Sequence, residues 1–335
     1  MLGYVARRLV WMVVVLGGVT TITFFVARVI PADPVGAILG PQAPPEAIER
    51  EKERWGLDKP IYVQYARYMA GLLRGDLGRS LRTRRPVLED IKQFFPATVE
   101  LALAALLIGV VMGIGLGMVS AVRSGQPVDH ASRVFAIVGL SMPAFWLGLL
   151  LLLVFYYRLG WLPGPGQLPY WLPRPPRVTG FLTIDAMLAR DWTAFVSYLH
   201  HLVMPAFTLG WLSTASITRI TRSSMLEVLR EEYIKTARMK GLRENVVVMK
   251  HAFKNALLPV ITVTGIRFAS LLEGAVLTET VFAWPGLGRY ATYSFLSIDF
   301  NAVVGTALFM ALLYAMSNLI VDLLYAYLNP KIRYD

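Results

Sequence analysis

The chain has 335 residues, of which 56% are hydrophobic and only 16% are charged, whereas a soluble domain carries about 25% charged residues. This composition excludes an ordinary soluble enzyme and indicates a chain that lies largely in lipid. The net charge of +11 does not predict nucleic-acid binding, because the basic residues lie between apolar segments rather than on one soluble domain. The lack of cysteine excludes disulfides, thiolate nucleophiles and Cys-ligated metal centres.

Apolar runs of spanning length recur along the chain, since a helix needs about 20 apolar residues to cross a hydrocarbon core of about 30 Å. Five runs are free of charge: 9–27, 101–122, 134–157, 202–218 and 302–321. A sixth, 256–281, is apolar apart from Arg267, Glu273 and Glu279. We therefore expect an all-α polytopic membrane protein with six transmembrane helices.

The first run, residues 9–27, follows Arg7 and Arg8, as the apolar core of a cleaved signal peptide would. It is longer than the usual core, and no small-residue cleavage pattern follows it. We interpret it as a retained signal-anchor helix.

Basic residues predict the orientation, because cytoplasmic loops carry an excess of Lys and Arg. Residues 219–255 hold nine Lys or Arg, whereas residues 282–300 hold only Arg289. The 219–255 loop and both termini are therefore expected in the cytoplasm. Residues 28–96 are also basic, but segments longer than about 60 residues cross largely regardless of charge.

Three regions are expected: 1–29, the N-terminus and first span; 30–96, a sizeable external segment; and 97–335, the core domain with spans two to six. In the external segment, turn-rich prolines precede a short surface helix over 46–54 and an amphipathic helix over 62–73. Residues 159–201 hold six prolines and are expected to be looped or extended rather than helical.

The basic loop between the fourth and fifth spans has helical character over 224–240, and Gly241 would end that helix as a C′ glycine. A second helical pattern over 245–255 continues to Pro259, where the fifth span would begin. The small Ala237 and Gly241 would let a groove of another protein approach the backbone closely. The alternative is a basic amphipathic loop that lies on anionic lipid.

Two stretches of this loop resemble a known motif. Residues 233–241, Tyr-Ile-Lys-Thr-Ala-Arg-Met-Lys-Gly, followed by 251–259, His-Ala-Phe-Lys-Asn-Ala-Leu-Leu-Pro, resemble the "EAA" loop of ABC importer permeases. Lys235 and Thr236 replace the general Glu and Ala, and Pro259 lies 18 residues after Gly241. Both departures look like the dipeptide/oligopeptide branch, and the role of the general glutamate does not carry over.

That resemblance implies a cytoplasmic coupling loop at 219–256 that docks into a cleft of an ATPase subunit. The coupling residues it implies are Glu232, Tyr233, Thr236, Ala237, Arg238, Gly241, Leu242, Asn255 and Pro259. Further stretches resemble the same branch in the same order along the chain: 56–65, 75–80, 86–87, 96–98, 278–288 and 322–330. Within them, the implied docking residues for an external binding protein are Asp76, Ser80, Trp284, Pro285 and Gly286.

The family role would be the permease subunit of an ATP-driven, binding-protein-dependent importer of di- or oligopeptides in the prokaryotic cytoplasmic (inner) membrane. The implied partners are a second homologous permease, two ATP-binding cassette ATPase subunits and an external substrate-binding protein, besides membrane lipid. No G-x-x-x-x-G-K-[ST] loop occurs, so ATP and Mg²⁺ would be bound by the partner ATPases and no cofactor by this chain. Nickel chelates, glutathione and oligosaccharides are alternative cargoes within the branch.

Charged residues inside spans are candidates for the substrate path, because burying one in a bilayer costs at least about 2.5 kcal/mol. The candidates are Glu100, Arg267, Glu273 and Glu279, of which Glu279 belongs to the family-like motif and is interpreted as structural or gating. Arg267 and Glu273 would lie about 120° apart around one helix and so face different neighbours. A zwitterionic peptide would suit Arg267 together with Glu273 or Glu100, but an interhelical ion pair is an equal alternative.

Other features have simpler interpretations. Gly109, Gly113 and Gly117 form two G-x-x-x-G steps, which favour packing within this chain over a moving contact with a second permease subunit. The adjacent His200 and His201 are interpreted as interfacial residues rather than metal ligands. An ion-coupled secondary transporter would need internal repeats, which are not detected. An intramembrane enzyme would need a nucleophile–base spacing, and none is found.

Overall fold

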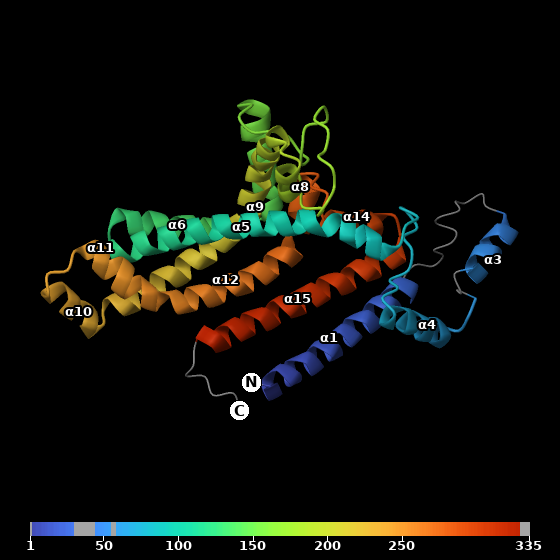
Figure 1. The fold of residues 1–335 in the computed structure, drawn as a ribbon, viewed down its shortest axis with the longest axis horizontal. Coiled ribbons are helices and arrows are strands. Elements are labelled where there is room, and N and C mark those ends of the chain that lie inside the picture. The colour runs from blue at the N-terminus through green and yellow to red at the C-terminus, as the bar shows by residue number, and fades with distance from the viewer. Residues whose placement is uncertain (1, 30–43, 55–57, 329–335) are drawn as a thin grey trace. The chain divides into compact units, whose positions relative to one another are not determined.

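The computed structural model describes residues 2–29, 44–54 and 58–328, and its regular elements there are helices (Figure 1). In chain order they are α1 (Leu2–Val29), α3 (Pro45–Arg54), α4 (Ile61–Leu73), α5 (Val87–Val122), α6 (Pro127–Ser141), α7 (Ala144–Leu151), the π-helix η1 (Leu152–Arg158), α8 (Leu182–Leu188), α9 (Trp192–Leu229), α10 (Glu232–Met239), α11 (Glu244–Val246), the π-helix η2 (Val247–Phe253), α12 (Lys254–Gly274), α13 (Val276–Val281), α14 (Leu287–Leu296) and α15 (Phe300–Leu328). The predicted all-α class is confirmed for the described residues.

The chain divides into two compact units, one joining Met1–Phe95 to Arg289–Leu313 and the other joining Pro96–Gly288 to Tyr314–Asp335. In the first unit, both helices predicted for the external segment are present as α3 and α4. The amphipathic α4 packs on α1, where the rings of Tyr65 and Tyr68 each lie 5.3 Å from that of Phe24. Aromatic side chains of α4 therefore pack against the first apolar run, although no residue of this helix is fully buried.

Three helical segments in the described residues are long and apolar enough to cross a membrane: Val87–Val122, Glu244–Leu272 and Phe300–Val321. A fourth results if the bent pair of α6 with α7 and η1 is one span, and Val10–Val26 is a shorter apolar helix. The described part of the chain thus gives three or four spans, and the count of six stays an expectation.

The apolar run 134–157, expected as one span, is bent by 105° between α6 and the α7–η1 helix. Pro143 lies at the break, where it lacks an N–H to continue the helix and disfavours the α-conformation of the residue before it. Met142 is accordingly extended, with φ −86° and ψ 121°. The two halves of this run therefore point in different directions.

Within the second unit, the glycine row of α5 packs against α9. A Cβ placed on Gly113 would lie 2.7 Å from the Cβ of Ile217, and one on Gly117 would lie 2.5 Å from the Cβ of Thr221. Gly109 faces Ser213 in the same way, whereas a Cβ on Gly115 would meet nothing within 4 Å. Close packing within this chain is thus confirmed, because the two helix backbones approach only where side chains are absent.

The stretch 159–201 is only partly a loop, so the prediction of a wholly non-helical segment is wrong. All six of its prolines lie before residue 177, and helices follow once they end: α8 begins at Leu182 and α9 at Trp192. The Oδ1 of Asp191 caps α9 by accepting a hydrogen bond from the Ala194 N–H at 2.9 Å. Helix α9 therefore starts ten residues before the predicted fourth span.

Candidate functional site

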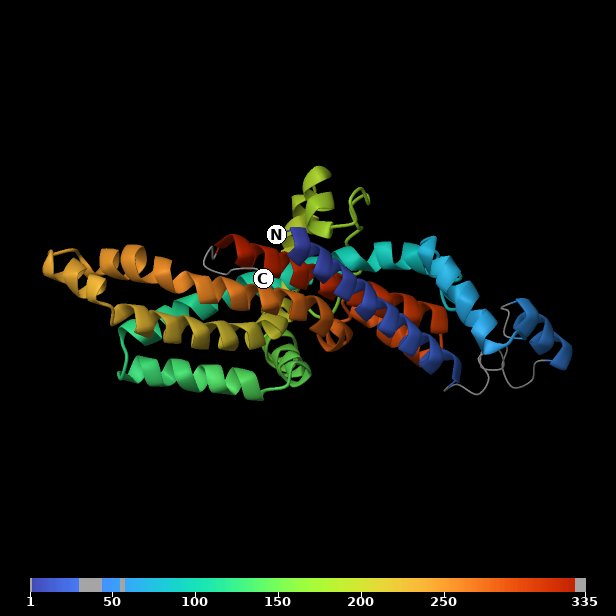
Figure 2. The same ribbon diagram turned by 90° about the horizontal axis from the view of Figure 1, so that it is seen from below.

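The basic loop forms a short separate helix, α10, between the ends of α9 and the α11–α12 segment (Figure 2). The single helix predicted over 224–240 is interrupted, because α9 ends at Leu229 and Glu231 is extended, with φ −67° and ψ 146°. This turn redirects the chain so that Ile234, with no exposed surface, joins an apolar cluster with Met225 and Val247. A straight continuation of α9 would carry Ile234 away from that cluster.

Helix α10 places its residues on two faces. Ile234 and Ala237 pack into the apolar cluster together with Val247 and Ala252, so Ala237 contacts its own chain and the predicted role of its small side chain in a partner's groove does not fit. The exposed side is formed by Glu232, Tyr233, Lys235, Thr236, Arg238 and Met239, and Lys240, which follows the helix, is exposed as well. This side is the surface that α10 offers to a partner.

Gly241 ends α10 as predicted, with a φ of +74° that favours glycine. The Gly241 N–H donates to the Arg238 carbonyl at 2.9 Å, and the Leu242 N–H donates to the Ala237 carbonyl at 3.4 Å. These two bonds make a Schellman motif, which satisfies the last carbonyls of the helix. The chain thus reverses sharply, and a Cβ on Gly241 would meet nothing within 4 Å.

Two polar contacts fix α10 to the segment that follows it. The Nδ2 of Asn255 donates to the Tyr233 hydroxyl at 2.9 Å, and the guanidinium of Arg238 donates to both oxygens of Glu244 at 2.7 and 3.1 Å. Planar two-point pairing of this kind is stronger and more directional than a single hydrogen bond. Together with the apolar cluster, these contacts join α10 rigidly to η2 and α12.

The position of Pro259 differs from the prediction that it begins a span. It lies inside α12, which starts at Lys254 and continues η2. The helix persists through the proline because Val247, Ala252 and Ala256, on its N-terminal side, all bury against the same apolar cluster. The π-helical turn η2 is a local widening of a kind that often occurs at functional positions.

The first substrate-path candidate, Glu100 on α5, is 7% exposed and fully engaged by its own chain. Its Oε1 accepts hydrogen bonds from the Thr183 N–H at 2.8 Å and the Thr183 hydroxyl at 2.5 Å, and its Oε2 accepts one from the Tyr198 hydroxyl at 2.6 Å. The carboxylate therefore ties α8 and α9 to α5.

Glu279 is also fully buried, and its Oε1 accepts a hydrogen bond from the Thr98 hydroxyl at 2.7 Å. The Thr98 hydroxyl oxygen in turn accepts the Leu287 N–H at 2.8 Å. A Cβ on Gly286 would clash with the Glu279 carboxylate, which explains why glycine stands at that position. The structural interpretation of Glu279 agrees with these contacts.

The 284–286 segment is held by the same packing. Trp284 has no exposed surface, and its indole N–H donates to the Ala97 carbonyl at 2.9 Å. Gly286 is buried and Pro285 is half-buried. Of this predicted docking set, only Pro285 presents appreciable surface within the chain.

The other two predicted substrate-path residues lie on α12. Arg267 is half-buried, and no described carboxylate lies within ion-pair distance of it. The side chain of Glu273 lies outside the described residues. Both interpretations of Arg267 and Glu273, as substrate-binding residues or as members of interhelical ion pairs, therefore stay predictions.

In the first unit, the predicted docking residue Asp76 is exposed and its Oδ1 accepts the Gly78 N–H at 2.8 Å. Ser80 is 2% exposed, and its hydroxyl donates to Asp299 at 2.5 Å. Ser80 therefore anchors its loop, and its predicted role in docking an external protein stays a prediction.

Residues 113–334 match the family described as "Binding-protein-dependent transport system inner membrane component", and residues 1–102 match the N-terminal family of the same system. The chain belongs to this permease family. It is therefore a permease component and not an enzyme, and ATP hydrolysis in such systems resides on a separate subunit.

Named relatives align with nearly the whole length of this chain. The chain is 47% identical to the probable D,D-dipeptide transport system permease protein of Escherichia coli K12, and the alignment covers 98% of this chain and 97% of that protein. It is 44% identical to the dipeptide transport system permease protein of Alkalihalophilus pseudofirmus, covering 100% of each chain. The fold is similar to an inward-facing methionine ABC transporter structure, with a TM-score of 0.51 and 17% identity over 70% of this chain and 93% of the other.

Sequence reasoning missed one polar junction of this permease. Arg222 on α9 donates to both oxygens of Asp129 on α6, at 2.8 and 3.0 Å, and Ser120 on α5 donates to the same carboxylate at 2.6 Å. Asp129 is 1% exposed. The junction ties three helices together seven residues before α9 ends. The sequence signals for this junction are weak: Asp129 lies shortly before the apolar run 134–157, and Arg222 lies shortly after the run 202–218.

Proposed function

We propose that this permease forms one half of the membrane pathway of an ATP-driven importer for di- or oligopeptides, with α10 as the coupling helix. The observation that carries the proposal is the build of α10, which is short, exposed on one side and fixed to the following helix on the other. The permease has no phosphate-binding loop of its own, so an outside motor must act on such an element.

The proposed assembly contains a second homologous permease, two ATPase subunits that bind ATP and Mg²⁺, and an external binding protein. The proposed topology has six spans formed by α1, α5, the bent α6–α7–η1 pair, α9, α12 and α15. Both termini and α10 face the cytoplasm, because the nine basic residues of the 219–255 loop mark the inside. No cofactor is proposed for this chain.

The mechanism follows from how α10 is attached. Movement of the ATPase subunits displaces α10, and the contacts of Tyr233 and Arg238 with Asn255 and Glu244 pass that displacement to α12. The apolar cluster passes it to α9 through Met225. Rigid-body motion of packed helices against each other is an established way to switch between two states. Exposed residues of α10 and the adjoining Leu242 provide the contact surface.

Peptide cargo is proposed because the relatives at 47% and 44% identity are named dipeptide permeases. The glutathione transport system permease protein of Escherichia coli O6:H1 is 37% identical over 334 residues and covers 100% of each chain, so a glutathione-like peptide is the second candidate. Arg267 and Glu273 are proposed to line the path and meet the carboxylate and ammonium of the cargo.

Competition transport tests this proposal. Proteoliposomes that hold the complete complex and its binding protein are assayed for ATP-dependent uptake of radiolabelled dialanine, with unlabelled di- and tripeptides, glutathione, a nickel chelate and an oligosaccharide as competitors. Peptide import predicts that only the peptides compete strongly. Strong competition by the oligosaccharide or chelate alone would reject peptide cargo, and uptake driven by an ion gradient without ATP would reject the importer class.

A further inference from the structure

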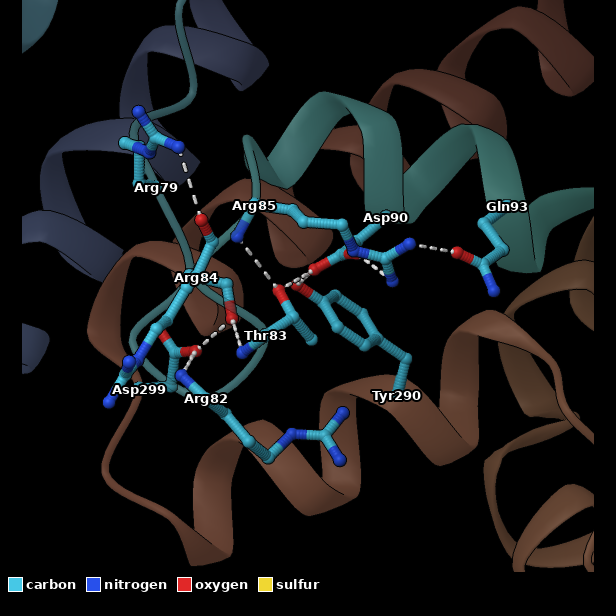
Figure 3. A network of polar contacts seen from close by, with 10 residues as sticks. Arg79, Arg82, Thr83, Arg84, Arg85, Asp90, Gln93, Tyr290 and Asp299 are labelled. Atoms are coloured by element: carbon cyan, nitrogen blue, oxygen red, sulfur yellow. Dashed lines mark hydrogen bonds and ion pairs between the residues drawn. The ribbon is translucent and has the colours of Figure 1, made fainter.

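An arginine-rich loop over residues 79–85 lies between α4 and α5, outside the coupling site (Figure 3). Four of its seven residues are arginine. The loop closes on itself, because the Ser80 N–H donates to the Arg85 carbonyl at 2.9 Å and the Arg84 N–H donates to the Ser80 carbonyl at 3.0 Å. An isolated β-bridge between Arg79 and Pro86 joins its two ends.

Two carboxylates without exposed surface, Asp299 and Asp90, anchor the loop. Asp299 accepts hydrogen bonds from the Ser80 hydroxyl at 2.5 Å and the Arg82 N–H at 3.2 Å. Asp90 accepts one from the Thr83 hydroxyl at 2.5 Å and pairs with Arg85 at 2.6 Å. The backbone is thereby fixed, and the charge of Arg85 is matched within the unit.

The remaining three arginines, Arg79, Arg82 and Arg84, are exposed and have no carboxylate partner among the described side chains. The guanidinium of Arg82 lies 5.8 and 5.7 Å from the ring centres of Tyr290 and Tyr293, which orients it by cation–π attraction. Arg84 has a φ of +58°, a conformation rare for residues other than glycine. Such a conformation persists only where surrounding contacts over-determine it, and it clusters at sites of binding.

We propose that the 79–85 arginine loop binds an acidic surface of the external substrate-binding protein. This inference rests on the proposed function, which places residues 30–96 outside the membrane. Rigid guanidinium groups pair with carboxylates at two points, and a loop that is already ordered loses little conformational entropy on binding. Mobile lipid headgroups would need no such fixed arrangement, and Arg and Tyr are typical anchors of protein interfaces.

The test measures the affinity of the purified, dipeptide-loaded binding protein for the complete complex in nanodiscs, at several salt concentrations. One set of nanodiscs contains neutral phosphatidylcholine and the other contains added phosphatidylglycerol. The variant Arg79→Gln/Arg82→Gln/Arg84→Gln is compared with the control Lys59→Gln/Arg67→Gln/Arg74→Gln, which removes the same charge from the preceding segment. Gel filtration of each complex establishes that the variants assemble.

The loop variant is expected to raise Kd about tenfold or more in neutral nanodiscs and to weaken the salt dependence, and the control is expected to change Kd less than threefold. Equal affinities for the loop variant and wild type in neutral nanodiscs would overturn the proposal. A defect that occurs only with phosphatidylglycerol would assign the loop to lipid and overturn it too. Failure of the wild-type complex itself to bind any peptide-loaded binding protein would instead reject the proposed function.

Discussion

The side-chain amide of Asn255 donates to the hydroxyl of Tyr233 at 2.9 Å, and this bond joins the short helix α10 to the beginning of α12. The two residues are 22 positions apart and on opposite sides of the Gly241 turn. A displacement of α10 would therefore act on the start of α12 directly, as well as through the helical segment between them.

Removing this bond is expected to weaken coupling more than folding. Tyr233→Phe loses one exposed hydrogen bond, and Asn255→Ala loses that bond together with one to the His251 carbonyl; each bond is worth about 1 kcal/mol or less. We expect the peptide imported per ATP hydrolysed to fall about two- to fivefold, with little change in melting temperature. The assay is parallel uptake and ATP hydrolysis in proteoliposomes, with Tyr314→Phe as a control at another exposed tyrosine. An unchanged ratio in both variants would remove this bond from the coupling path.

Loss of Arg222 is expected to destabilise the permease itself, because the buried Asp129 would lose its closest charged partner and keep only the more exposed Arg133, at 3.6 Å. Breaking a fully buried pair costs roughly 3–5 kcal/mol, and the cost here is smaller because the Arg222 side chain is 24% exposed. Arg222→Ala should lower the melting temperature by several degrees, whereas Arg230→Ala, at an exposed position of the same helix end, should not. Equal melting temperatures for the two variants would show that the junction carries no stability.

The glycine row supplies a matched pair of substitutions. Gly113→Val would drive its side chain into Ile217, while Gly115→Val would meet open space. Overpacking typically costs about 1–3 kcal/mol, and more where a backbone must move. We expect Gly113→Val to reduce the yield and melting temperature of the purified protein and Gly115→Val to leave both close to wild type. A reversed order would contradict the packing of α5 on α9.

Acid should weaken the segment around Asp185, at the start of α8. Burial alone would raise the pKa of this carboxyl, but hydrogen bonds from the Thr179 N–H and hydroxyl and from the Gly180 N–H outweigh it and hold the pKa below its usual value. The carboxylate therefore stabilises the fold at pH values above its ordinary pKa of about 3.9, and that contribution is lost as pH falls through the lowered pKa. The difference in melting temperature between wild type and Asp185→Asn should shrink on acidification. A difference independent of pH would reject this role.

Local patterns predicted much of this structure. Propensity and spacing act directly between residues that are near in sequence. They predict the helices α3 and α4, the role of Gly241 as the C′ residue of α10, and the face of α5, marked by Gly113, that packs closely on another helix. The break before α10 was not predicted, because it depends on Ile234 reaching a cluster built from Met225 and Val247.

Long-range polar contacts could not be predicted from the sequence either, because they join residues that are far apart along the chain. Asp129 and Arg222 are 93 positions apart, and Thr98 and Glu279 are 181 apart. A charge near an apolar run shows that a partner is needed but not which residue supplies it. The sequence therefore predicts a substrate-path role for Glu100, although Thr183 and Tyr198 occupy both of its oxygens.

The coupling role of α10 is tested most directly by site-specific cross-linking, since the chain has no cysteine of its own. A Met239→Cys variant carries its thiol at a position that is 79% exposed, and a Tyr170→Cys control carries it in the loop after η1, at a position that is 95% exposed. Both are reacted in the assembled complex with a maleimide–succinimidyl ester cross-linker, whose maleimide adds to the new thiol and whose ester acylates a lysine of a neighbouring subunit. We expect Met239→Cys alone to cross-link to an ATPase subunit and the cross-link to block ATP-driven uptake. Cross-linking of the ATPase to the Tyr170→Cys variant instead, or full uptake despite a complete Met239→Cys cross-link, would contradict α10 as the coupling helix.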